Sequence, residues 1–194
     1  TRESTTAIHT NMVKAIAAEI VKTIIAKKPE LFIGYLGCSS VDDVKEKRTE
    51  LLTYSNMAAF CHDIGKLAIA DIINIQYRKI TDTEFEMIRE HPGIGEDILR
   101  SIPYLRPFAD IAHGHHKNYD DEKGYPRDFL HKESENAIWI DIITLSDCID
   151  AATDARGRIY KNAKSFDEVL EEFKVGTDTM YNGELVELLS ETES

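Results

Sequence analysis

The spacing of apolar residues at the start of the chain is the feature that most limits its fold. Apolar side chains recur every three or four residues from Ile8 to Ile24, which is the period of a helix face packed on a core. Proline and the residue before it resist helix, so Lys28 and Pro29 predict the end of this helix. No segment shows a convincing strand-like alternation of apolar and polar residues. The sequence therefore predicts an all-α fold.

The rest of the chain repeats the helical pattern between polar loops. Two capping boxes, TDTE at 81–84 and SFDE at 165–168, each predict a helix start, and Asn182 predicts the start of a short terminal helix. We expect loops at 29–43 and 117–134, and one compact HD-type helical bundle over residues 1–194. The further helices are predicted from the charged stretch 42–50 to near Gly65, and at 82–90, 94–103, 105–116, 135–155 and 165–176.

Composition limits what this bundle contacts. The chain has 194 residues, 42% of them apolar, and no stretch approaches the length of a membrane span, so we expect no membrane contact by this domain. A net charge of −12 argues against binding to polymeric nucleic acid. Three scattered cysteines do not form a disulfide framework, which favours a cytoplasmic location. The helical pattern already under way near Thr1 suggests a domain excised from a longer multidomain protein.

The histidines carry the chemical signal. Five of the seven fall between His62 and His116, at or near predicted helix ends. Each one alone is weak, because the helix dipole favours a histidine at a C-terminus for structural reasons. Asp147 alone indicates only a polar residue within a helix. Together, imidazoles and carboxylates suit a site for iron, manganese or zinc.

The order of these residues resembles a known family. Residues 61–66, CHDIGK, resemble the HDIGK signature of HD-GYP domains, a branch of the HD phosphohydrolases. The resemblance covers about residues 1 to 190. The later motifs of the family are matched in this chain by EHP at 90–92, the histidine pair at 115–116, GYP at 124–126, SDCIDA at 146–151, R-x-Y-K at 158–161 and the closing segment after Gly176.

The resemblance implies a dinuclear metal site of two divalent transition-metal ions. Iron or manganese is expected, with zinc, cobalt and nickel as the other candidates. Asp63 would bridge both ions, because the two oxygens of a carboxylate can bind separate metals. Thr5 stands where some members carry a glutamate that supports a third ion, so we predict two. One ion would take His9, His62 and Asp147, and the other His91, His115 and His116.

The implied activity is that of a cyclic-dinucleotide phosphodiesterase. Cyclic di-GMP would be hydrolysed to pGpG, or onward to GMP, by a metal-activated hydroxide, with Asp63 and Lys66 as catalytic residues. Lys66 would neutralise the phosphate, although a lysine there also suits a solvated helix C-terminus. Tyr125, Arg158 and Lys161 match the family's ligand-binding positions. Tyr125 could equally pack its loop, and Arg158 could pair with surface carboxylates.

The sequence departs from the family pattern in places. Lys117 replaces the glutamate common after the histidine pair, and the loop before Gly124 has an extra residue. About two residues are inserted before Arg158, which makes Arg156 a competing phosphate contact. The separation of 53 positions between His9 and His62 is long for the family, and the 29–43 segment that accounts for it is a lid, a partner surface or decoration. His113 matches no family ligand.

Two alternatives to cyclic di-GMP hydrolysis stay open. One is an HD phosphohydrolase acting on another nucleotide, and the other is a catalytically inactive sensor of cyclic dinucleotides. The family also implies an attached sensor or regulatory domain, and a homodimer is a further expectation. Metal content and product analysis discriminate among these functions.

Overall fold

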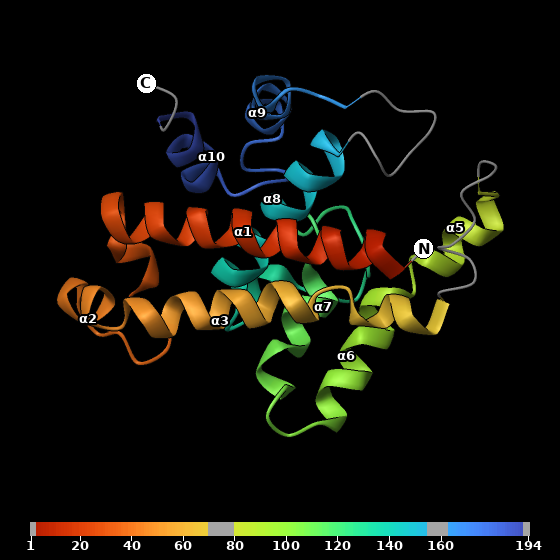
Figure 1. Ribbon diagram of the computed structural model, residues 1–194, viewed down its shortest axis with the longest axis horizontal. Coiled ribbons are helices and arrows are strands. Elements are labelled where there is room, and N and C mark those ends of the chain that lie inside the picture. Colours follow the sequence, from red (N-terminus) through yellow and green to blue (C-terminus); the bar gives the residue numbers. More distant parts are fainter. Residues whose placement is uncertain (1–2, 70–79, 155–162, 192–194) are drawn as a thin grey trace.

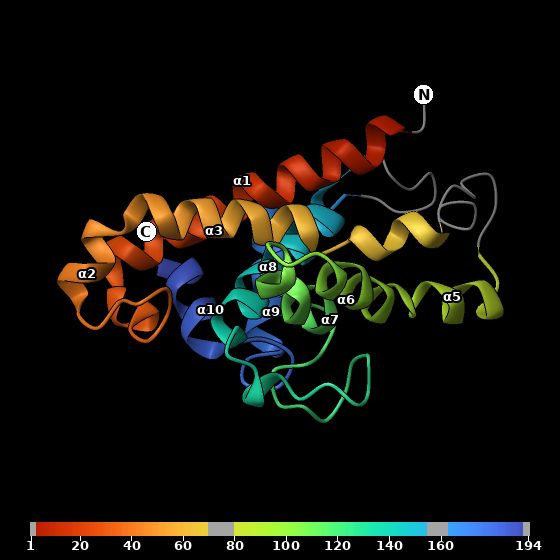
Figure 2. The ribbon, with the colours of Figure 1, turned by 90° about the horizontal axis from the view of Figure 1, so that it is seen from below.

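Three helices form the centre of the bundle in the computed structural model, which describes residues 3–69, 80–154 and 163–191, with side chains from residue 7 onward. The long helix α1 (Glu3–Lys27) packs along α3 (Arg48–Cys61) and against α8 (Ala137–Thr153), as Figures 1 and 2 show. The other helical elements are η1 (Pro29–Phe32), α2 (Val41–Glu46), η2 (Ile64–Ile69), α5 (Asp82–Ile88), α6 (His91–Ser101), η3 (Arg106–Phe108), α7 (Ala109–Gly114), η4 (His131–Glu133), α9 (Phe166–Val175) and α10 (Gly183–Ser190).

The all-α prediction is confirmed. The described residues contain no β-strand, only two isolated bridges, Lys117 with Gly124 and Thr177 with Tyr181. Both predicted capping boxes are present, at Thr81 and at Ser165, each with its reciprocal pair of hydrogen bonds. Among the described helices, none has both the length and the apolar character needed to cross a membrane.

Helix α1 shows why the apolar period matters. Val13, Ala17 and Ile24 are fully buried against the core, as their spacing predicts. Ile8 and Met12, the first members of the same pattern, are instead exposed. The N-terminal turns of α1 therefore contribute less to the core, and they carry His9.

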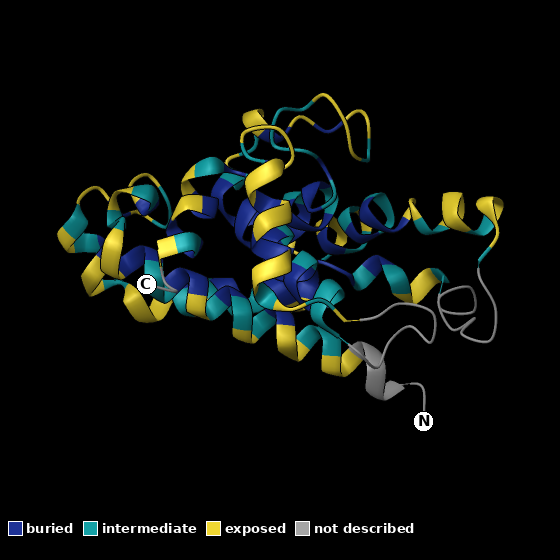
Figure 3. Cartoon of the chain, turned by 90° about the horizontal axis from the view of Figure 1, so that it is seen from above, coloured by how far each residue is buried: buried dark blue, intermediate teal, exposed yellow. Residues whose placement is uncertain are grey.

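Helix α8 is the most enclosed element. Ile140, Ile142 and Ile143 have no exposed surface, so the helix is apolar on several faces and lies inside the bundle. Buried residues gather in the middle of the molecule, as Figure 3 shows. Within this apolar setting, Asp147 and Asp150 are also buried. Buried carboxylates are costly unless they are paired or bind a cation, so their presence here indicates a functional site.

The segment before α3 corrects the sequence prediction. The expected loop at 29–43 contains η1 and the start of α2, whose N-cap is Ser40. Phe32 is buried and stacks on Trp139 at the start of α8, 5.0 Å between ring centroids. This contact fixes the segment to the core near the C-terminal end of α1. His9 lies 18 residues earlier on that helix, or about 27 Å away, so the segment is not a lid over His9.

Two predicted helix boundaries were also wrong. The second helix is interrupted at Lys47, and its α-helical part ends at Cys61 rather than near Gly65. The helix expected at 105–116 is instead η3 followed by α7, because Pro107 lies in the first turn of η3 and does not donate an N–H. Pro92 likewise lies in the first turn of α6, where proline is tolerated, and does not separate two elements.

Candidate metal centre

The central residue of the site is Asp63, which follows the C-cap of α3. Its Oδ2 atom lies 3.3 Å from His9 Nε2 and 3.3 Å from His62 Nε2. Its Oδ1 atom lies 3.3 Å from His91 Nε2 and 3.7 Å from His115 Nε2. The two oxygens of one carboxylate therefore face two different groups of histidines, which is the arrangement expected of a bridging ligand.

Two groups of potential ligands surround this carboxylate. The carboxylate half consists of His9, His62 and Asp147 beside Asp63 Oδ2, and the imidazole half consists of His91, His115 and His116 beside Asp63 Oδ1. Within each group of three, one ligand atom per residue lies within 4.8 Å of the others. The structure thus brings together all seven metal ligands predicted from the sequence.

The glycine in CHDIGK explains how the two halves meet. A Cβ atom at Gly65 would lie 2.0 Å from the carbonyl oxygen of His91 and 2.7 Å from the backbone nitrogen of Gly95. No side chain fits there, so glycine lets η2 approach α6 backbone to backbone. This approach places His91 beside Asp63.

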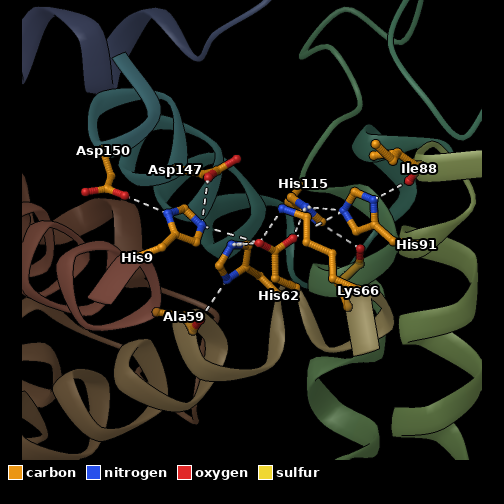
Figure 4. Close-up of polar contacts among 11 residues, drawn as sticks. His9, Ala59, His62, Lys66, Ile88, His91, His115, Asp147 and Asp150 are labelled. Atoms are coloured by element: carbon orange, nitrogen blue, oxygen red, sulfur yellow. Dashed lines mark hydrogen bonds and ion pairs between the residues drawn. The ribbon is translucent and has the colours of Figure 1, made fainter. Parts of the chain in front are cut away.

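Three histidines share one orientation, which Figure 4 shows. In each of them Nδ1 contacts the carbonyl oxygen of the residue three positions earlier. The distances are 2.7 Å from His62 to Ala59, 2.6 Å from His91 to Ile88 and 2.8 Å from His115 to Ala112. An Nδ1–H that donates to a carbonyl leaves the Nε2 lone pair facing the centre, as a metal ligand requires.

His9 reaches the centre from α1 and has a different partner. Its Nε2 lies 3.3 Å from Asp147 Oδ1, while its Nδ1 lies 2.6 Å from Asp150 Oδ2 (Figure 4). Sequence reasoning missed Asp150. The sequence did contain a signal for it: Asp150 lies three residues after Asp147, and this spacing places both carboxylates on one side of α8.

The polar side chains of the site are buried, which makes any unpaired polar atom among them costly in free energy. His62 and His91 have no exposed surface, and Asp63 is 7% exposed. His62 Nε2 and Asp63 Oδ1 are buried without a hydrogen-bond partner in the described part of the chain. Buried polar atoms left unpaired cost free energy, and divalent ions at these positions would satisfy them. The donor set therefore fits a pair of divalent transition-metal ions.

The pKa values of the histidines differ between the two halves. Burial lowers the pKa of His115 to about 4 and holds the pKa of His116 well below its usual value, so these imidazoles are neutral near pH 7. Burial acts in the same direction on His9, but hydrogen bonds to Asp147, Asp150 and Asp63 outweigh it and raise its pKa to about 11. The carboxylate half thus has a strong affinity for positive charge.

The carboxylates of Asp63 and Asp147 both stay ionised. Burial would raise the pKa of Asp63, but the charges of His62 and Lys66 hold it well below the usual range. Burial acts likewise on Asp147, and the hydrogen bond from His9 lowers its pKa instead. Ionised carboxylates are the form that binds metal.

Two of the predicted substrate-binding residues, Lys66 and Tyr125, lie at the edge of the centre. Lys66 Nζ is 2.5 Å from Asp63 Oδ2. The Tyr125 ring lies 4.7 Å from that of His116 and 6.4 Å from that of His91, centroid to centroid. Arg158 and Lys161, like the competing Arg156, fall outside the described residues.

The GYP segment folds back onto the histidine pair. Gly124 has a φ of +84°, and a Cβ there would lie 2.4 Å from the carbonyl oxygen of His116. Tyr125 donates its backbone N–H to that same carbonyl, at 3.1 Å. The altered approach to this loop therefore does not remove Tyr125 from the site. This return of the GYP segment also places the Tyr125 ring 5.6 Å from the guanidinium of Arg89. Sequence reasoning missed Arg89 as a neighbour of the site.

His113 lies outside both halves. Its Nδ1 is 2.7 Å from Glu96 Oε2, and its ring meets Phe129 edge-on at 5.2 Å. It therefore connects α7 to α6 and to the loop before α8, away from Asp63.

Comparison with known proteins agrees with this geometry. Residues 19–185 match the model of the HD domain family. The chain is 36% identical to a cyclic di-GMP phosphodiesterase of Thermotoga maritima over 144 residues, which are 73% of this chain and 38% of that protein. It is 35% identical over 118 residues to the cyclic di-GMP phosphodiesterase response regulator RpfG of Xanthomonas campestris, covering 59% of this chain and 29% of the relative.

A relative with another named substrate also matches. The 3'3'-cGAMP-specific phosphodiesterase 3 of Vibrio cholerae is 29% identical over 146 residues, 75% of this chain and 29% of that protein. The chain thus spans well under half the length of these relatives. The family match covers most of the chain, including every described residue of the centre except His9. The chain belongs to the HD domain family, and its resemblance to the HD-GYP branch is confirmed.

Proposed function

We propose that this chain is a metal-dependent phosphodiesterase that hydrolyses cyclic di-GMP to pGpG, with GMP as a further product. The observation that carries the proposal is the position of Asp63, whose two oxygens face two separate groups of histidines at 3.3–3.7 Å. A pair of ions held in this way suits in-line attack on a phosphodiester. Relatives named cyclic di-GMP phosphodiesterases support this substrate.

The seven predicted ligands would hold the ions in two sets. His9, His62 and Asp147 would hold one ion, and His91, His115 and His116 the other, with Asp63 between them. When bound, the ions would supply Lewis acidity and a nucleophile from water at neutral pH. Iron or manganese is proposed for both positions, because their borderline character favours mixed nitrogen and oxygen ligands.

The remaining residues would bind and orient the dinucleotide. Lys66 places an ammonium next to Asp63, where it would meet the negative charge of the scissile phosphate. Tyr125 offers a half-buried ring that lies tilted beside that of His116 and would contact the sugar or base. Arg158 and Lys161 are proposed as further ligand contacts. Such local cations are needed in a chain whose net charge is −12, because the ligand is itself an anion.

Turnover of cyclic di-GMP tests the proposal directly. The chain is loaded with Mn(II) or anaerobically with Fe(II), incubated with the dinucleotide, and the products are separated by chromatography. We expect pGpG to accumulate first, and we expect Asp63→Asn to form none. The matched control is Asp97→Asn, which makes the same change at an exposed position of α6. Binding without hydrolysis by the fully loaded chain would instead indicate a sensor and would reject the proposal.

A second substrate is favoured by two of the relatives. Proteins named 3'3'-cGAMP-specific phosphodiesterases match at 29% and 34% identity. The same centre would serve both substrates, because both contain the 3'–5' phosphodiester. Comparing kcat/KM for cyclic di-GMP and 3'3'-cGAMP on one preparation decides between them, and a tenfold preference for 3'3'-cGAMP would reverse our assignment.

Attachment to a regulatory domain is the last element of the proposal. The chain covers 38% of the Thermotoga relative and 29% of the Xanthomonas protein, whose name describes a response regulator. We propose that this domain acts under the control of such a partner. Comparing the turnover of the domain alone with that of the whole protein would test the control, and equal rates with and without the signal would reject it.

A further inference from the structure

The partner of His9 distinguishes it from three other histidines of the centre. His62, His91 and His115 each contact a backbone carbonyl through Nδ1. His9 instead contacts a carboxylate oxygen of Asp150, at 2.6 Å. Asp150 is 5% exposed and lies on α8, 141 positions away from His9 in the chain.

The contact has a direct effect on the ring. A carboxylate accepts a hydrogen bond from Nδ1–H more strongly than a neutral carbonyl does, and so keeps the proton on Nδ1 when Nε2 gives up its own proton to bind a metal ion. The other nitrogen, Nε2, is left facing Asp63 and Asp147, each at 3.3 Å. A carboxylate behind a ligating imidazole also raises the basicity of that imidazole toward a metal. Asp150 therefore acts on the atom that would bind the ion.

A purely structural role explains the contact less well. Helices α1 and α8 already pack through fully buried apolar side chains such as Val13, Ala17 and Ile142. A buried ion pair adds little to such packing, because the cost of removing charge from water offsets the attraction. Three carboxylates, those of Asp63, Asp147 and Asp150, converge on the single imidazole of His9. This excess of buried negative charge suits a cation in addition to the ring.

We propose that Asp150 is a positioning residue that holds His9 for the ion of the carboxylate half. The two ions then depend on it unequally, because the described ligands of the imidazole half do not contact Asp150. The proposal rests on the metal centre of the proposed function and deepens it by assigning a role to a residue outside the ligand set.

The test measures metal binding and does not depend on activity. Asp150→Asn keeps the shape and one acceptor oxygen but removes the charge, and Asp150→Ala removes both. Each variant is stripped, reloaded with Mn(II), desalted and assayed for bound metal, and its affinity is measured by competition with a chelator. The parent should hold two ions. Asp150→Ala should keep one ion at parental affinity and bind the other about 10- to 100-fold more weakly, with Asp150→Asn between the two.

A double-variant cycle separates positioning from general destabilisation. His9→Ala should weaken the same ion, and adding Asp150→Ala to it should cause little further loss, because Asp150 acts through His9. Asp97→Asn should bind both ions as the parent does, and circular dichroism should show all variants folded. If Asp150→Ala fails to fold, the nearly isosteric Asp150→Asn keeps the test open.

The outcomes are distinct. Two ions at parental affinity in both Asp150 variants would overturn this inference and leave the proposed function intact. Additive losses in the His9 and Asp150 cycle would overturn it as well. A folded parent that binds fewer than two ions would reject the dinuclear centre itself, and this inference with it.

Discussion

The two halves of the centre are built in different ways. The imidazole half comes from α6 and the end of α7, elements that are near in sequence and pack on one another. The carboxylate half joins His9 of α1, His62 after α3 and Asp147 of α8, which are far apart in sequence. The first half depends on local packing, whereas the second depends on the whole core. The chemistry differs too, because burial keeps His115 and His116 neutral in one half, whereas the other half brings carboxylates together around His9.

The largest expected effect comes from the residue shared by the halves. Asp63→Asn leaves the fold able to pack but removes the charge that faces both groups of histidines. We expect both ions to be lost after desalting, together with all turnover. Metal analysis of the folded variant checks this. Retention of one ion would show that Asp63 belongs to one half only.

Removing one ligand of the imidazole half should affect that half alone. His91→Ala deletes a ring 3.3 Å from Asp63 Oδ1 while leaving the residues near Oδ2 in place. We expect one ion to remain bound and activity to be lost, because both ions act on the phosphodiester. His113→Ala is the matched control, since its ring contacts Glu96 and not Asp63. Loss of both ions from His91→Ala would mean that the halves do not load independently.

The junction between the halves can be strained without changing a ligand. Gly65→Ala would place a Cβ 2.0 Å from the His91 carbonyl oxygen, so α6 must move. We expect a destabilisation on the order of 3 kcal/mol, which for a chain of this length lowers Tm by roughly 6–12 °C. Metal affinity should fall as well, because His91 moves away from Asp63.

Gly93→Ala provides the control for this strain. A Cβ at Gly93 meets nothing within 4 Å, and the residue also lies in α6. Alanine there should stabilise by at most about 1 kcal/mol, as helix propensity dictates. Equal thermal shifts in Gly65→Ala and Gly93→Ala would contradict the close approach of η2 to α6.

The smallest expected effect concerns a histidine outside both halves. Burial would lower the pKa of His131, but Asp141, 2.8 Å away, raises it above the usual value. Asp121 adds to the rise, and the ring also faces Tyr119. Because the folded pKa exceeds the unfolded one, the stabilisation is fully present below about pH 6.5. It is lost as the pH rises through the folded pKa.

Unfolding of the metal-free chain in urea tests the His131 effect. The difference in unfolding free energy between the parent and His131→Gln should be largest near pH 6 and should decrease toward pH 8. Metal stoichiometry should not change, because His131 does not contact either half in the described structure. A difference that grows with pH would refute the sign of the shift.

Short-range patterns made much of the fold predictable. The apolar period of α1 and the capping boxes at Thr81 and Ser165 are local signals, and the structure has a helix at each. The breaks at Lys47 and before α7 were missed because they depend on how the segments pack. The same limit applied to residues 29–43, where Phe32 reaches Trp139 across the core. A local sequence pattern does not predict a contact between residues so far apart in the chain.

The site was predictable in its residues but not in its geometry. The motif order singled out the seven ligands, yet only the fold brings His9 of α1 to Asp147 of α8. Asp150 was missed because its role depends on which ring lies in front of it. Arg89 was missed for the same reason, since its position beside Tyr125 depends on the return of the GYP segment toward α5. Contacts of this kind require tertiary structure.

Helix α1 ties one ligand of the centre directly to the core. Val13, Ala17 and Ile24 hold it in the core, and His9 lies about one turn, or about 6 Å, before the first of them. Over that distance a tilt of about 5° would move His9 by only about 0.5 Å, a quarter of the length of a metal–nitrogen bond. The seating of α1 in the core therefore fixes the position of His9 relative to Asp147, so that the packing of a single helix sets the geometry of one half of the centre.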